Sequence, residues 1–154
     1  MGTMVTTQKD STSNVEVEQK STAGAAHVLL AGSPAYPSGA TAITGASGNV
    51  ANASAVATLA AAASVTTYIT GFEVTGAGAT AGLPVIVTVT GTVTGTLSFI
   101  AVAAVGALVA NSPLIIEFPV AIPASAVNTA IVVTVPALGA GNTHSTVVSH
   151  GYRL

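Results

Sequence analysis

The stretch VIVTVTGTVT, residues 85–94, decides the fold class of this chain. Its valines and threonines alternate, and side chains two residues apart lie on the same face of a β-strand. The valines expected on one face are Val85, Val87, Val89 and Val93. The threonines expected on the other face are Thr88, Thr90, Thr92 and Thr94. Because β-branched residues fit a pleated sheet better than a helix, the stretch predicts a half-buried strand.

Alternation of the same period continues on both sides of this stretch. The further strands that it predicts span residues 65–75, 97–102, 114–118, 129–135 and 143–152. Residues 55–63 have helical propensity, but a strand that leads into Val65 is equally plausible, and we favour the strand. Turns rich in Gly, Pro or Asn are expected at residues 76–78, 82–84, 111–113, 119–123 and 139–142. Within residues 65–75, Tyr68, Phe72 and Val74 are expected to share a face. Strands spaced about ten residues apart predict an all-β, antiparallel β-sandwich or jelly roll.

The N-terminal third has a different composition. Residues 1–21 are polar and lack large apolar side chains, and residues 33–48 are rich in Gly, Ser, Pro and Ala. We therefore expect an extended N-terminal arm and linker over residues 1–53 and the sandwich domain over residues 54–154. Ordering the arm requires an external partner, so it is expected to lie along a neighbouring subunit. Its apolar anchors would be Val5, Val15 and Val17.

Charged residues are scarce and concentrated in the arm. Only 5% of the 154 residues are charged, against about 25% in an ordinary soluble domain. Five of the eight lie in the first twenty residues: Lys9, Asp10, Glu16, Glu18 and Lys20. The rest of the chain holds Glu73, Glu117 and Arg153. Arg153 is the only cation outside the first twenty residues and cannot by itself neutralise a phosphate backbone, so nucleic acid is excluded as a partner. The lack of cysteine excludes thiolate metal sites and disulfides.

No membrane partner is expected, although half of the residues are hydrophobic. The longest apolar run spans residues 99–110, whereas a spanning helix needs about 20 residues. Residues 1–14 lack the apolar core of a signal peptide, so we expect synthesis in the cytoplasm.

Three histidines invite a metal or acid–base interpretation. His144 and His150 would share the face of one strand but lie about 20 Å apart, and His27 has no carboxylate near it in sequence. We expect all three to be hydrogen-bonded structural residues. A symmetric trimer could instead gather three copies of one histidine on its axis.

Nucleophilic and carboxylate catalysis also lack support. The chain has one Asp, Asp10, and no Gly-x-Ser-x-Gly motif. Glu73 and Glu117 could form a pair of the glycosidase type. Solvent-facing carboxylates, or pairing with Arg153, explain them more simply. We therefore expect a non-enzymatic protein with no catalytic residue, metal, cofactor or small-molecule substrate.

Two repetitive segments have simple explanations. Residues 76–82, GAGATAG, lack the lysine and the following helix of a phosphate-binding loop, so a turn is expected. The regular threonines at positions 88, 90, 92, 94 and 96 are similar to ice-binding faces, but they occur once. An ordinary polar sheet face is expected there.

A body with three charges leaves an adhesive surface of Thr, Ser, Ala, Gly and Val, which free monomers avoid. Burial against other copies explains this surface, and a closed ring such as a homotrimer is expected. The composition therefore favours a structural assembly component.

Three segments carry a resemblance to small virion proteins of tailed bacteriophages. They are VTTYITGFEVTGAGAT (65–80), NTAIVVTVP (128–136) and HGYRL (150–154). The resemblance runs from near Ala55 to the C-terminus, about two thirds of the chain. It implies a β-sandwich on the virion, a capsid decoration or cement protein that binds the major capsid protein or another virion protein. A head–tail junction or fibre-base component would look similar. An adhesin or ice-binding β protein is the other alternative.

Overall fold

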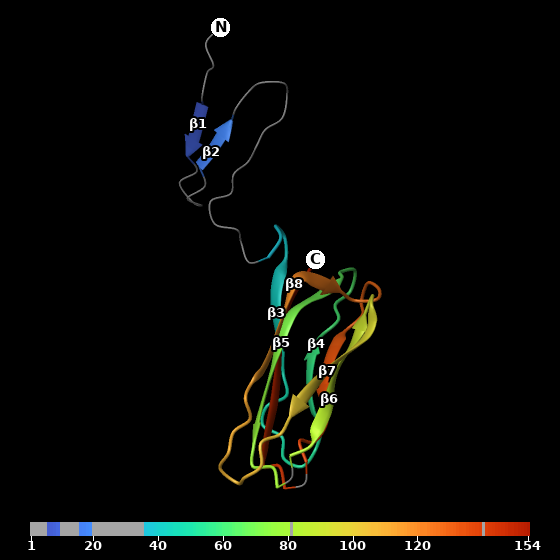
Figure 1. The fold of residues 1–154 in the computed structure, drawn as a ribbon. Helices are drawn as coiled ribbons and strands as arrows, with labels where there is room; N and C mark the ends of the chain where they lie inside the picture. Colours follow the sequence, from blue (N-terminus) through green and yellow to red (C-terminus); the bar gives the residue numbers. More distant parts are fainter. Residues whose placement is uncertain (1–5, 10–15, 20–35, 81, 140) are drawn as a thin grey trace. The chain divides into compact units, whose positions relative to one another are not determined.

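A computed structural model describes residues 6–9, 16–19, 36–80, 82–139 and 141–154 (Figure 1). The chain divides into two compact units, Met1–Ser38 and Gly39–Leu154. The regular structure of the described residues consists of β-strands and includes no helix.

In the first unit, β1 (Thr6–Lys9) and β2 (Glu16–Gln19) pair antiparallel, with Lys9 opposite Glu16. Of the expected apolar anchors, Val5 and Val15 lie outside the described residues. The position of this segment on a neighbouring subunit stays a prediction.

The second unit contains two four-stranded antiparallel sheets that pack face to face in a sandwich-like architecture (Figure 1). The sheet that we call the β10 sheet has the order β3 (Thr41–Ala46), β10 (His144–Arg153), β5 (Thr67–Ala77) and β8 (Leu114–Pro123). The β6 sheet has the order β4 (Ala55–Leu59), β9 (Ile131–Val135), β6 (Pro84–Thr92) and β7 (Gly95–Val102). The all-β, antiparallel prediction is therefore confirmed.

Successive strands alternate between the sheets, and the hairpin β6–β7 is the exception among β3–β10. The core fills the space between them. Phe72 of the β10 sheet contacts Phe99 of the β6 sheet edge to face, with ring centroids 5.2 Å apart. Phe118 packs against both rings. On β9, Ile131, Val133 and Val135 are fully buried, as alternation requires.

The valine face of β6 ends at an irregularity. Val87 and Val89 are fully buried, but the pairing with β7 shifts between Val89 and Thr92. Thr92 consequently points inward, where its hydroxyl donates to the Gly95 carbonyl, and Val93 is 59% exposed. The expectation that Val93 shares the buried valine face is wrong, because a bulge inserts one residue into the alternation.

The face predicted for Tyr68 is wrong for the same reason. The register of β5 shifts between Ile69 and Gly71, and Ile69, Phe72 and Val74 are the buried residues. Tyr68 lies on the opposite face of the β10 sheet from Ile69, where its ring stacks on Tyr152.

Two other boundaries differ from those expected. Residues 119–123 belong to β8 rather than to a turn, because an edge strand tolerates proline, which cannot donate a ladder hydrogen bond. Strand β3 precedes the expected domain boundary at residue 54 and pairs with β10 over six positions. The β10 sheet thus includes part of the segment assigned to the linker.

Candidate functional site

The ionisable side chains of the sandwich gather on the outer face of the β10 sheet. Glu73 lies on β5 opposite Val148 of β10 and Ile115 of β8. One row further along, Gly71 lies opposite both His150 of β10 and Glu117 of β8. The fold therefore brings Glu73, Glu117 and His150 to neighbouring positions around a glycine that has no side chain.

The closest pair in this group is His150 and Glu73. The Nε2 atom of His150 lies 3.2 Å from Oε1 of Glu73, and the side chains are 39% and 48% exposed. Such an exposed pair is screened by water and contributes little to stability. His150 is therefore hydrogen-bonded to Glu73 across the paired strands β10 and β5.

Neither carboxylate has the surroundings of a glycosidase acid. Glu117 is exposed, as Glu73 is, and both stand on an open sheet face. In the described part of the chain, no three His, Asp or Glu side chains approach closely enough to hold a metal ion.

The remaining sequence candidates lie apart from this pair. His144 is exposed at the start of β10, where Nδ1 lies 2.9 Å from the Thr143 hydroxyl. His27 lies outside the described residues. The Arg153 guanidinium donates from Nε and Nη2 to the Ala60 carbonyl, at 3.0 and 2.6 Å. Arg153 therefore binds backbone, whereas the sequence suggested pairing with the glutamates.

Two tyrosines complete the outer face. The ring centroids of Tyr68 and Tyr152 lie 4.8 Å apart at an interplanar angle of 11°. Burial raises the pKa of the Tyr152 hydroxyl, and the neighbouring Tyr68 raises it further. The two rings pack against each other across the paired strands β5 and β10.

The glycine-rich segment is a structural turn in its described residues. Ala79 is buried, and its carbonyl accepts a hydrogen bond from Gly106 N. Gly78 has a φ of +82°, and a Cβ there would collide with Thr143. Its conformation and tight packing explain the glycine without a phosphate.

Threonines occupy the outer face of the β6 sheet. Thr88 pairs with Thr134 of β9 on one side and Ser98 of β7 on the other, and Thr90 lies opposite Val132. Thr58 of β4 also lies opposite Val132. Thr92 leaves this array by turning inward, so the ladder expected from the sequence is interrupted.

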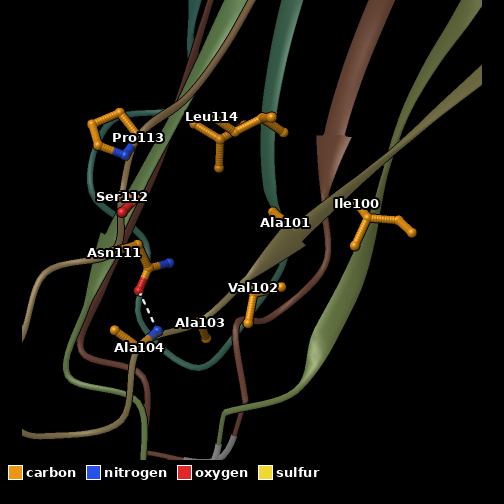
Figure 2. A pocket seen from close by; sticks show the side chains of 10 residues that line it. Ile100, Ala101, Val102, Ala103, Ala104, Asn111, Ser112, Pro113 and Leu114 are labelled. Carbon is orange, nitrogen blue, oxygen red and sulfur yellow. Dashed lines mark hydrogen bonds between the residues drawn. The ribbon is translucent and has the colours of Figure 1, made fainter.

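A groove of about 360 Å³ opens where the edge strands β7 and β8 diverge (Figure 2). Its walls come from the end of β7, the connection that follows, the start of β8 and Val74 of β5. Asn111 braces this connection, because its Oδ1 accepts a hydrogen bond from Ala104 N at 2.8 Å (Figure 2). The groove is lined mainly by small and apolar side chains, so it has no acid, base or nucleophile pair.

The exterior of the sandwich is the most unusual surface. Large apolar side chains are exposed on both sheets and on the loops. The most exposed are Leu108 (98%), Val120 (79%), Ile100 (69%), Val102 (61%) and Ile115 (60%). The scarcity of charged residues predicts an uncharged surface, but alternation alone does not show which apolar residues lie on it.

Among the described residues, no helix is long and apolar enough to cross a membrane. Comparisons with protein-family models, with curated proteins and with solved structures find no match for this chain.

Proposed function

We propose that this protein is a structural component of a tailed-bacteriophage virion, a decoration or cement protein that binds the outer surface of the head and stabilises it. The observation that carries the proposal is the exterior, where Leu108, Val120 and Ile100 are exposed and charges are few. Exposed apolar area of this kind marks surfaces that become buried against protein.

The strand order supports this proposal at the level of the fold. The orders β3-β10-β5-β8 and β4-β9-β6-β7, with connections that cross between the sheets, support a jelly roll as the finer form of this fold. Jelly rolls recur in viral capsid proteins, although a fold alone does not specify a function. The protein would act without catalysis or cofactor, on the virion, in contact with the major capsid protein. A head–tail junction or fibre base would use the same surface.

The experiment adds the purified full-length chain to heads that lack it. We expect saturable binding and a rise in the temperature at which heads rupture, measured by calorimetry. A soluble β-sandwich protein with an ordinary charged surface serves as the control and should leave the rupture temperature unchanged. If neither binding nor a shift occurs at saturating concentration, the proposal is wrong.

A second candidate function rests on the threonine array. Thr58, Thr88, Thr90 and Thr134 lie on the outer face of one sheet, with adjacent strands about 4.8 Å apart. Such an array could match an ordered surface, as in an ice-binding protein or adhesin. In that case the free protein should shape ice crystals or bind cells, and Thr88→Tyr should abolish the effect. A cement protein should do neither.

A further inference from the structure

The two corners of the sandwich differ in how their edge strands are closed. At the corner formed by β3 and β4, the backbones are in close contact: a Cβ on Gly45 would lie 2.5 Å from the Thr58 carbonyl oxygen. Just beyond β4, Arg153 binds the Ala60 carbonyl. These contacts cover the edge of β4.

The opposite corner, between β7 and β8, is open and contains the groove. Strand β8 carries features that discourage pairing with another chain. Pro119 and Pro123 have no N–H group to donate, and Glu117 places a charge on the strand. Edge protection at this corner is therefore present on β8.

Strand β7 has no such protection. Its sequence, GTLSFIAV, contains neither charge nor proline, and β6 is its only strand partner among the described residues. Its register with β6 is regular from Leu97 to Val102. An uncharged, regular edge presents a row of free backbone groups to another strand.

We propose that β7 is the contact between two copies of this chain, pairing antiparallel with β7 of the second copy about a two-fold axis. The β6 sheets of both copies would then form one continuous sheet. This inference goes beyond the proposed function, because it assigns a contact within the oligomer, and it favours a two-fold pair over the three-fold ring expected from the sequence.

Self-pairing is favoured over a foreign strand by the chemistry of the edge. A strand without charges meets no like-charge repulsion from its own copy and offers no charge pattern that would select a different partner. The outer face beside the edge is also apolar: Ile100 is 69% exposed opposite Ile86, which is 58% exposed, and Val102 is 61% exposed. A two-fold axis through β7 brings both copies of this patch together, as an isologous interface requires.

Sedimentation equilibrium of the full chain tests the proposal. We expect a dimer for the wild type. For Ile100→Lys we expect the dissociation constant to rise about tenfold or more, because the β7–β7 interface would then contain one lysine from each copy. Ser98→Lys, on the same face of β7, provides a second variant. Val120→Lys is the matched control, since Val120 is 79% exposed on β8 and should leave dimerisation unchanged. Circular dichroism checks that each variant is folded.

Hydrogen exchange identifies the strand directly. The alternate amides of residues 96–102 that point away from β6 should gain protection as the protein concentration rises, whereas the amides of the central strand β9 should not change. A monomer at about 100 µM, a trimer, or a dimer unaffected by both β7 variants would overturn the proposal. A monomer whose β7 becomes protected only on phage heads would assign the edge to the coat protein and would also overturn it.

Discussion

The phenol rings of Tyr68 and Tyr152 stack on adjacent strands, β5 and β10, with centroids 4.8 Å apart. The two residues are direct register partners, and Tyr152 is only 7% exposed. Burial raises the pKa of Tyr152, and the electrostatic effect of the neighbouring Tyr68 raises this pKa further.

This raised pKa predicts a loss of stability in alkali. In the unfolded chain the Tyr152 hydroxyl ionises near pH 10, whereas the folded state holds the proton to higher pH. The stability contribution is therefore fully present below about pH 10 and is lost as the pH rises through the folded pKa. Urea denaturation across this range should show the decline. Tyr152→Phe should reduce it, and Tyr68→Phe should reduce it less; an unchanged pH profile in Tyr152→Phe would contradict the assignment.

The position of Tyr68 in this stack also shows which structural features the sequence pattern did not predict. Period-two alternation predicted β5, β6, β7 and β10 because their residues are β-branched or aromatic and strictly spaced. It placed Tyr68 and Val93 on the wrong faces, because bulges near Thr70 and Gly91 each shift the alternation by one residue. Gly71 and Gly91 were the available signal, since a glycine inside a strand often marks a bulge. Strand β3 was missed because its sequence, TAITGA, has one large apolar side chain, and its partner lies about a hundred residues away.

The candidate site was foreseeable only in its constituents. The sequence singled out Glu73, Glu117 and His150, but their convergence around Gly71 depends on long-range register that no local pattern encodes. The difference between the edges of β7 and β8 could be anticipated in part, since Pro119 and Glu117 are visible in the sequence. That both strands are edges required the topology.

Close packing of β3 on β4 predicts that Gly45 tolerates no side chain. In Gly45→Ala, the new Cβ would lie 2.5 Å from the Thr58 carbonyl oxygen and 2.8 Å from the Ser149 hydroxyl oxygen. Because a backbone carbonyl cannot move aside as a flexible side chain can, we expect a loss of about 1–3 kcal/mol in the free energy of unfolding. Ala46→Ser, which also adds one heavy atom on β3 but at an exposed position, should change it by less than about 0.5 kcal/mol. Equal urea midpoints for both variants would show that the corner is not tightly packed.

Asn142 is a second position at which we expect a substitution to lower the free energy of unfolding. It is fully buried, and its Nδ2 donates to the His144 carbonyl at 2.7 Å and to the Ala77 carbonyl at 3.3 Å. Asn142→Ala leaves these carbonyls without that donor, at a cost of about 1–3 kcal/mol. Thermal and urea denaturation measure the loss. Asn49→Ala, at an exposed position, is the control. If Asn142→Ala is as stable as this control, the hydrogen bonds of Asn142 do not stabilise the fold.

Fragments of the chain test where the folded domain begins. Residues 39–154 form one compact unit, so this fragment should unfold at the same urea concentration as the full chain.

A fragment of residues 54–154, the boundary expected from the sequence, lacks β3. It loses the pairing of β3 with β10, the packing of Ile43 on the core and the reciprocal backbone bonds between Val50 and Ser145. At about 0.5–1.5 kcal/mol for each lost hydrogen bond, several such losses amount to at least about 3 kcal/mol, which is a large part of the stability of a small domain. We therefore expect residues 54–154 to unfold at much lower urea concentration or to aggregate through the newly exposed edge of β10. If residues 54–154 are as stable as residues 39–154, β3 is dispensable, and the packing of β3 on β4 does not hold the sandwich together.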